Sequence, residues 1–250
     1  MSDWLLPLRK ALDEMSTSVD IFIRDDDTGW ATKQLFELLN LCQKLEVPID
    51  LAAIPTEMNS ALADNLMTQM YISNGSIGIH QHGYSHLNHE TEGRKYEFGQ
   101  SRDAVQQFND ILNGQNILKS FFDVQLDPFF TPPWNRCTQD TLVALECAQI
   151  ILLSRDNTAK PLPCVGAYEL PVTFDWLKKK NGEHLNKSIL AEILAGQLSQ
   201  QDTIGIMLHH EMMDETNRVD FIELIRCLQQ SPSIQFNSMR SLIAKNVSNA

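Results

Sequence analysis

The residues best suited to chemistry are the histidines in Gly78–His86, a stretch that reads GIHQHGYSH. Four of the chain's seven histidines lie between His80 and His89. His82 and His86 are four residues apart, and in a helical turn this spacing places both rings on one side, close enough to share a cation. A nearby carboxylate would complete a set that leaves positions open for water and substrate. The pattern indicates a divalent-metal site, with two hydrogen-bonded histidines as the simpler alternative.

Three consecutive carboxylates, Asp25, Asp26 and Asp27, follow the apolar run Val19–Ile23. They would repel one another unless a cation or the adjacent Arg24 compensates them. One of them could bind metal, and another could take a proton from water made more acidic by that metal. A solvated acidic turn or a helix cap is the alternative.

A second histidine pair, His209 and His210, ends the apolar run 204–208. Placed opposite a metal and a carboxylate, one of the two could protonate a leaving amine as a general acid. Successive side chains of a strand point to opposite sides, so only one of them can face straight into a cavity. Taken alone, the pair could also be hydrogen-bonded histidines at a barrel rim.

The elements that must position these residues alternate between strand-like and helix-like apolar periods. This alternation predicts an α/β fold with parallel strands, and we interpret residues 1–250 as a single domain. About seven strands and no glycine-rich phosphate loop favour a barrel over a dinucleotide-binding sheet. Strands are predicted over 19–23, 47–54, 77–79, 128–131, 150–153, 168–174 and 203–208, and helices over the N-terminal residues, 35–45, 62–70, 102–112, 139–147, 187–198 and 219–228.

Unusual polar residues follow the carboxyl ends of five predicted strands. In a parallel barrel these ends converge on one face, where active sites are built, so we expect the clusters to surround one cavity. The clusters are 25–27, the histidines at 80, 82 and 86, the stretch 132–136, the pair 175–176, and 209–211.

Composition narrows the possible partners and the compartment. The net charge of −12 argues against nucleic acid, which requires basic surface. The scattered cysteines, Cys42, Cys137, Cys147, Cys164 and Cys227, are odd in number and form no CxxC pair, which indicates reduced, mostly buried thiols. The N-terminal segment lacks the basic region and the uninterrupted apolar region expected of a signal peptide, and no stretch approaches the length expected of a bilayer span. We therefore expect a soluble cytoplasmic protein without a membrane partner.

In chain order, these blocks resemble the motifs of the polysaccharide deacetylase (NodB homology, carbohydrate esterase family 4) superfamily, from roughly Phe22 to Glu211. The family motif Thr-Phe-Asp-Asp-Gly aligns with 24–28, which implies that Asp26 is the catalytic base and Asp27 a metal ligand. A register one residue earlier would make them Asp25 and Asp26. The motif His-Ser/Thr-x-x-His matches 82–86 and implies that His82 and His86 are metal ligands.

The later motifs match in part. In the third, Arg-Pro-Pro-x-Gly, Thr131 replaces the arginine that helps to tune the base and Asn135 replaces the glycine, so Arg24 or Arg136 could take over. The fifth, Leu-x-His, implies His209 as general acid, with His210 as an alternative. The fourth, an Asp and a Trp, resembles 175–176. His80 is expected to line the pocket or to support a ligand. The residues expected to bind substrate are Trp134, Asn135, Arg136, Asp175, Trp176, His80 and His210.

The resemblance implies a distorted (β/α)7-type barrel, a divalent metal, usually zinc, and hydrolytic removal of acyl groups, mostly from amino sugars. The leading hypothesis is a metal-dependent deacetylase acting on the amide nitrogen of an amino sugar, oligosaccharide or related small molecule. One alternative is a C–N hydrolase of a small non-sugar amide, because a cell-wall polymer is awkward without a secretion signal. The other is a non-catalytic carbohydrate- or metabolite-binding barrel, suggested by the altered third motif. The sequence gives no signal for oligomeric state.

Overall fold

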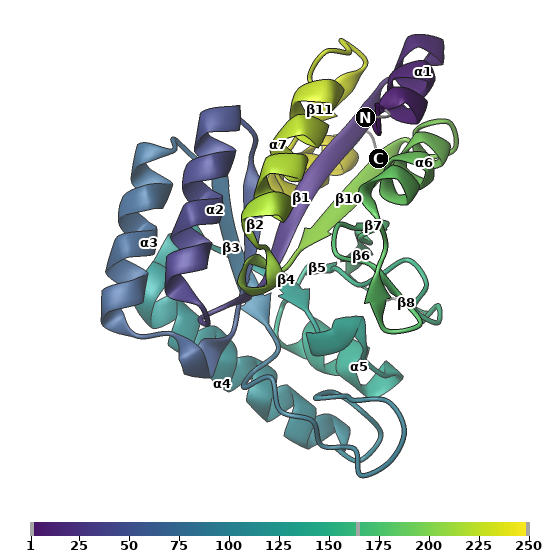
Figure 1. Cartoon of the computed structure of the whole chain (residues 1–250). Helices are drawn as coiled ribbons and strands as arrows, with labels where there is room; N and C mark the ends of the chain where they lie inside the picture. The colour runs from purple at the N-terminus through teal and green to yellow at the C-terminus, as the bar shows by residue number, and fades with distance from the viewer. Residues whose placement is uncertain (1–2, 164–165, 249–250) are drawn as a thin grey trace.

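The computed structural model describes residues 3–163 and 166–248, and its main sheet is parallel and curled (Figure 1). The strand order is β6-β5-β4-β3-β2-β1-β10-β7, with β11 beside the start of β1. Its strands are β1 (Val19–Thr28), β2 (Ile49–Ala53), β3 (Ile77–His82), β4 (Leu126–Thr131), β5 (Leu152–Leu153), β6 (Tyr168–Glu169), β7 (Phe174–Asp175), β10 (Thr203–Leu208) and β11 (Ile234–Phe236).

The segment Tyr168–Asp175 joins β5 to β10 and so closes the sheet. Its backbone N–H groups as far as Val172 donate to residues 151–155, whereas the N–H of Thr173 donates to Gly205. Pro171, on the side of the segment facing β10, has no N–H, so pairing with β10 begins only at Thr173. Counting β6 and β7 as one strand gives the predicted distorted (β/α)7 barrel, although the strand predicted over 168–174 pairs in two short pieces.

Helices cover the outside of the sheet (Figure 1). Packed neighbours include α2 with α7, α3 with α4, α4 with α5 and α1 with α6. Capping boxes begin α4 at Asp103 and α7 at Asp214, which accounts for the helix starts after polar loops. The helices are α1 (Leu6–Glu14), α2 (Thr32–Leu45), α3 (Ser60–Ile72), α4 (Ala104–Phe122), α5 (Gln139–Cys147), α6 (Lys187–Leu198), α7 (Glu215–Leu228) and α8 (Met239–Ser248).

Several elements differ from the predictions. Helix α4 ends at Phe122, ten residues past the predicted end at 112. Buried Leu118 and Phe122 extend its apolar face. The sequence did not predict β11, α8 or the hairpin of β8 (Lys179–Lys180) and β9 (Glu183–His184). Cys42, Cys137 and Cys227 are buried and Cys147 is exposed, while Cys164 lies outside the described residues.

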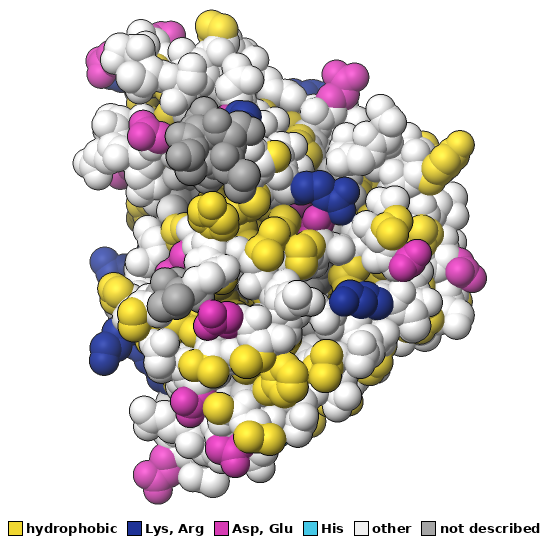
Figure 2. Space-filling model, turned by 180° about the vertical axis from the view of Figure 1, so that it is seen from behind, with side chains coloured by type: hydrophobic (Ala, Val, Ile, Leu, Met, Phe, Trp, Pro, Cys, Tyr) yellow, Lys and Arg dark blue, Asp and Glu magenta, His cyan; other side chains and the backbone are white. Residues whose placement is uncertain are grey.

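The core lies between the sheet and the helices. One large cluster joins residues of β1, β2, β3 and β10 to the inner faces of α2, α3, α6 and α7. Two smaller clusters lie around β4 and β5. On the face seen in Figure 2, basic side chains stand in small separate groups among hydrophobic and acidic ones. No helix in the described part of the chain is long and apolar enough to cross a bilayer.

A pair of buried carboxylates occupies the amino-terminal end of the sheet. Asp50 in β2 and Asp127 in β4 flank Gly78, where a Cβ atom would lie 2.3 Å from Asp50 Oδ1 and 3.4 Å from Asp127 Oδ2. Neither of these two oxygens has a hydrogen-bond partner among the described residues. Burial raises the pKa of Asp50 to about 8, and the nearby Asp127 carboxylate adds to the rise.

Because of the raised pKa of Asp50, we expect the free energy of unfolding to depend on pH. The folded chain keeps a proton on Asp50 that the unfolded chain releases near the ordinary aspartate pKa of 3.8. The free energy of unfolding should therefore fall as pH rises from about 4 to about 8 and level off above that range. Asp50→Asn should flatten that fall, as measured by denaturant unfolding at several pH values. Equal pH slopes for the wild type and the variant would contradict the shift.

Candidate functional site

Strand β1 carries the three carboxylates within its length, so the predicted strand end at Ile23 was wrong. Each carboxylate has a partner, and the mutual repulsion that would end the strand is thereby removed. The register of β1 against β2 shifts between Asp25 and Thr28, and Asp27 has a left-handed backbone with φ 67°. Such a bulge redirects a side chain, which lets the consecutive Asp26 and Asp27 both approach His82 and His209.

The structure brings Asp27, His82 and His86 together. Asp27 Oδ1 lies 3.2 Å from Nε2 of His82 and 3.2 Å from Nε2 of His86. The donor atoms of all three lie within 4.8 Å of one another. Burial tends to raise the pKa of Asp27, but hydrogen bonds from the two histidines lower it well below its usual range.

The four-residue spacing suggested that the two histidines share a helical turn, but the structure has no helix there. His82 ends β3, and a tight turn carries the chain to His86, with Gly83 at φ 57° and His86 at φ 56°. A Cβ atom at residue 83 would lie 2.1 Å from the carboxylate of Glu97. That buried carboxylate accepts the backbone N–H groups of Tyr84 and Ser85 at 3.0 and 2.7 Å and so holds the turn.

These donors fit a divalent metal. Two imidazoles and a carboxylate are a common zinc set, and ligand bonds of about 2.1 Å in a tetrahedron separate donors by about 3.4 Å, close to the distances here. His82 Nδ1 lies 3.0 Å from the carbonyl oxygen of Thr131, and this contact orients the ring so that Nε2 faces Asp27. His86 is held between Trp30 and Trp134, with ring centroids 4.9 and 4.6 Å away.

Asp26 is held by Arg24. The guanidinium donates Nε to Asp26 Oδ1 at 2.7 Å and Nη2 to Oδ2 at 2.8 Å, and both residues are buried. Burial raises the pKa of Asp26, but the charge and hydrogen bonds of Arg24 and the charges of His82 and His209 together lower it below its usual value. Arg24 also donates to Ser154 and to Asn135 Oδ1. Of the two arginines that could compensate for Thr131, Arg24 is therefore the one in contact with the carboxylate.

Arg24→Lys keeps the charge but loses the two-pronged contact, so we expect the pKa of Asp26 to rise. If Asp26 is the base, the acidic limb of kcat/KM against pH should move to higher pH. Removing the charge in Arg24→Gln should cost about 3–5 kcal/mol of stability, because a buried carboxylate loses its partner. Arg136→Gln is the control, and its acidic limb should stay in place. An unmoved limb in Arg24→Lys would show that Arg24 does not tune the base.

The side chains of the consecutive residues His209 and His210 lie in different environments. The His210 ring is buried, with Nδ1 2.6 Å from Asp25 Oδ2 and Nε2 3.0 Å from the Trp30 carbonyl oxygen. Burial lowers the pKa of His210, but Asp25 raises it to about 9. His209 is half-buried and close enough to Asp26 and Asp27 to lower the pKa of both. His209 therefore faces the cluster, whereas Asp25 and His210 form a structural pair.

Besides His210, two other residues expected to bind substrate lie in the interior. Trp176 is 3% exposed and packs against Trp4, Phe174 and Phe221 in the main core, so we correct its assignment to packing. His80 is fully buried, and its Nε2 contacts Thr131 Oγ1 at 2.8 Å. Burial and the charge of Arg24 lower the pKa of His80 to about 3, so it is neutral. His80 supports the wall behind His82.

The other predicted residues lie nearer the opening. Asp175 is close to His209, and burial raises its pKa although the His209 charge opposes the rise. Trp134 and Asn135 have left-handed backbones (φ 55° and 58°) in the short turn Pro133–Asn135. Arg136 follows them and lines a cleft beside the site. Left-handed non-glycine residues cost energy and concentrate at functional sites, as Asp27, His86, Trp134 and Asn135 do here.

Sequence reasoning missed Trp30, Glu97 and Ser154. Trp30 contacts His86 and Ser154 contacts Arg24, both distant in the chain, whereas Glu97 holds the nearby backbone of Tyr84 and Ser85. No spacing pattern marks these residues, so only predicted contacts between residues could have identified them.

Comparisons with known proteins support the resemblance at the level of the fold. No family model and no curated protein matches the sequence. A polysaccharide deacetylase from Mycobacterium smegmatis, described as putative, superposes with TM-score 0.66 at 13% identity, covering 94% of this chain and 92% of that one. A family 4 acetyl xylan esterase from Clostridium thermocellum, in complex with a cobalt ion, gives TM-score 0.60 at 14% identity, covering 90% of each chain.

A mutant of a family 4 pseudoenzyme gives TM-score 0.56 at 11% identity, covering 91% of this chain and 67% of that one. The chain therefore has the fold of the carbohydrate esterase family 4 deacetylases, and the predicted barrel is confirmed. Because the same fold occurs in a pseudoenzyme, the fold does not determine activity, which depends on the residues of the site.

Proposed function

We propose that this chain is a metal-dependent hydrolase that removes an acyl group from an amide nitrogen, in an amino sugar or a related small molecule. The observation that carries the proposal is the convergence of the possible metal donors Asp27, His82 and His86. Beside them lies a second carboxylate, Asp26, which pairs with Arg24 and is not one of these donors. Asp27, His82 and His86 would hold a divalent ion, for which zinc suits the donors. The ion would supply Lewis-acid polarisation of the acyl carbonyl and raise the acidity of water.

The chain's own residues divide the proton transfers. Asp26, kept ionised by Arg24, would accept a proton from the attacking water. His209 would deliver a proton to the departing nitrogen, and Asp175 lies beside it. A backbone N–H near Trp134 would stabilise the developing oxyanion.

The His209 assignment can be tested by its substrate dependence. His209→Ala should lower kcat by about 10²- to 10⁴-fold, because the departing nitrogen loses its proton donor. An activated leaving group, which needs little protonation, should restore much of the loss. His210→Ala should instead destabilise the fold by about 3–5 kcal/mol, because buried Asp25 loses its partner. If only His210→Ala shows the kinetic loss with leaving-group rescue, the general acid is His210.

The reaction itself is tested by product. Metal-loaded protein is incubated with N-acetylated amino sugars and, separately, with small primary amides. Release of acetate from the sugars supports the proposal, whereas release of ammonia from the amides alone would favour a C–N hydrolase of small non-sugar amides. Saturable sugar binding with neither product would indicate a binding barrel.

A further inference from the structure

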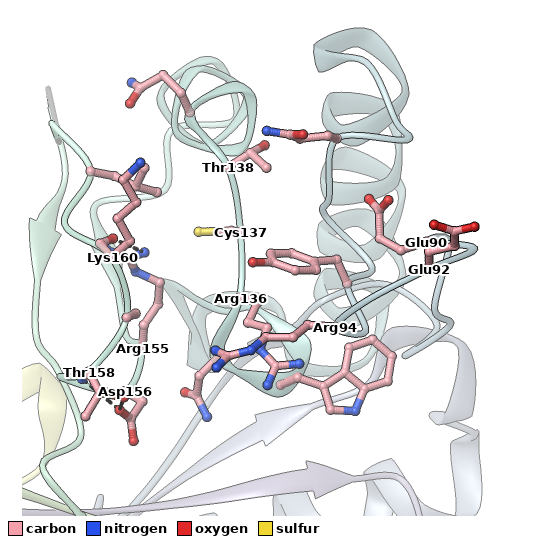
Figure 3. Close-up of a pocket in the computed structure, with 17 residues that line it drawn as sticks. Glu90, Glu92, Arg94, Arg136, Cys137, Thr138, Arg155, Asp156, Thr158 and Lys160 are labelled. Carbon is pink, nitrogen blue, oxygen red and sulfur yellow. Dashed lines mark hydrogen bonds between the residues drawn. The ribbon is translucent and has the colours of Figure 1, made fainter.

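A cleft of about 760 Å³ lies beside the candidate site (Figure 3). Three loops form it, each following the carboxyl end of a strand: part of 90–100 after β3, residues 134–139 after β4, and part of 155–162 after β5. The cleft adjoins the metal donors, because Trp134 in its wall contacts the His86 ring and Asn135 accepts a hydrogen bond from Arg24. A molecule held at the candidate site would therefore extend into this cleft.

Three cations of the cleft have no ion pair within the described residues: Arg94, Arg136 and Lys160. Within residues 3–163 and 166–248, the Arg136 guanidinium donates only to the Lys95 carbonyl oxygen, at 3.2 Å, and it lies 5.9 Å from the Tyr96 ring centroid. Burial lowers the pKa of Arg136, and the nearby positive charge of Arg94 lowers it further. Two guanidinium groups that repel each other gain most from an anion that contacts both.

Among the described residues, the carboxylates of the cleft form no ion pair with these cations. Asp156 accepts the backbone N–H of Thr158 at 2.7 Å, and Glu90 accepts that of Ser101 at 3.0 Å. In Figure 3, Arg94 and Arg136 lie between Asp156 on one wall and Glu90 and Glu92 on the other.

Arg155 shows the contrast with the unpaired cations. It is buried in the same cleft and is paired with Glu169 at 2.6 Å. In a chain of net charge −12, basic side chains left unpaired beside a candidate active site indicate a ligand of opposite charge.

We propose that this cleft binds an anionic group, a phosphate or a carboxylate, carried by the acylated substrate. The inference rests on the proposed function, because it takes the acyl group to lie at Asp27, His82 and His86. Arginine suits both oxyanions, since its planar fork donates two parallel hydrogen bonds to phosphate or carboxylate oxygens. The substrate class is therefore an acidic amino sugar, with Arg94 and Arg136 as specificity-determining residues.

Binding measured without turnover tests this inference. Chelator-treated protein is titrated calorimetrically with N-acetylglucosamine, with two phosphate esters of that sugar, and with its uronic acid. We expect an anionic probe to bind about 10- to 100-fold more tightly than the neutral sugar, as hydrogen bonds to charged groups imply. The tighter of the phosphate and carboxylate probes identifies the anion. The double variant Arg94→Gln/Arg136→Gln should lose the preference, and Arg226→Gln, on the outer face of α7, should keep it.

Equal binding of charged and neutral probes, no binding of any anionic probe, or a preference retained by the double variant would each overturn the inference. The proposed function fails differently, by the absence of acetate release from metal-loaded protein. A chain that prefers anions but releases no acetate would keep the anion site and lose the hydrolase. Acetate release without anion preference would do the reverse.

Discussion

Replacing Asp26 by asparagine is expected to lower kcat by about 10²- to 10⁴-fold while the protein still binds one metal ion per chain. Asparagine keeps the shape of the side chain but cannot take a proton from water. Metal binding should persist because Asp26 contacts Arg24, whereas the donors to the ion are Asp27, His82 and His86. Steady-state acetate release and elemental analysis of the same preparation measure the two effects.

Asp25→Asn is the matched control for this prediction. Asp25 is fully buried and accepts from the His210 backbone N–H at 2.9 Å, so its replacement should lower stability and leave metal content unchanged. The opposite pattern would show that the motif begins one residue earlier. In that pattern, Asp25→Asn keeps the metal and loses turnover, whereas Asp26→Asn loses the metal.

His82→Ala and His86→Ala should each abolish stoichiometric metal binding and acetate release without unfolding the chain. Loss of a residue that hydrogen-bonds a metal ligand lowers metal affinity by about 10- to 100-fold. Loss of the ligand itself should lower it further. His89→Ala is the control, because His89 belongs to the same histidine-rich stretch but its ring contacts Arg102 and lies outside the metal-donor set. Metal analysis after dialysis and circular dichroism provide the measurements. A ligand variant with full metal occupancy would contradict the assignment.

The sequence predicted the elements whose apolar pattern is strong. Helix α6 and strand β10 have the predicted bounds, because their inward faces are uniformly apolar and the period decides the element. Strand β1 was predicted too short because its carboxylates are stabilised from outside the strand. Asp25, for example, is paired with a histidine 185 residues away. Strand β11 spans only three residues, too few for a periodic pattern to show.

The candidate site was predictable in its residue types and less so in its geometry. Spacing alone singled out His82 and His86, but they meet through a turn held by Glu97, which no pattern revealed. The choice between His209 and His210 likewise needed the structure, because it depends on which of the two rings is hydrogen-bonded to Asp25. Trp176 was misassigned because the core side and the cavity side of a short strand cannot be told apart from sequence.

The most direct test of the proposed hydrolase is a metal titration of chelator-treated protein, with acetate release from an N-acetylated amino sugar measured at each step. We expect no release without metal and a rise with zinc or cobalt that saturates at one ion per chain. We expect no rise for His82→Ala. Full acetate release by metal-free protein, or one tightly bound ion per chain with no hydrolysis of any acylated amino sugar, would contradict the proposed function.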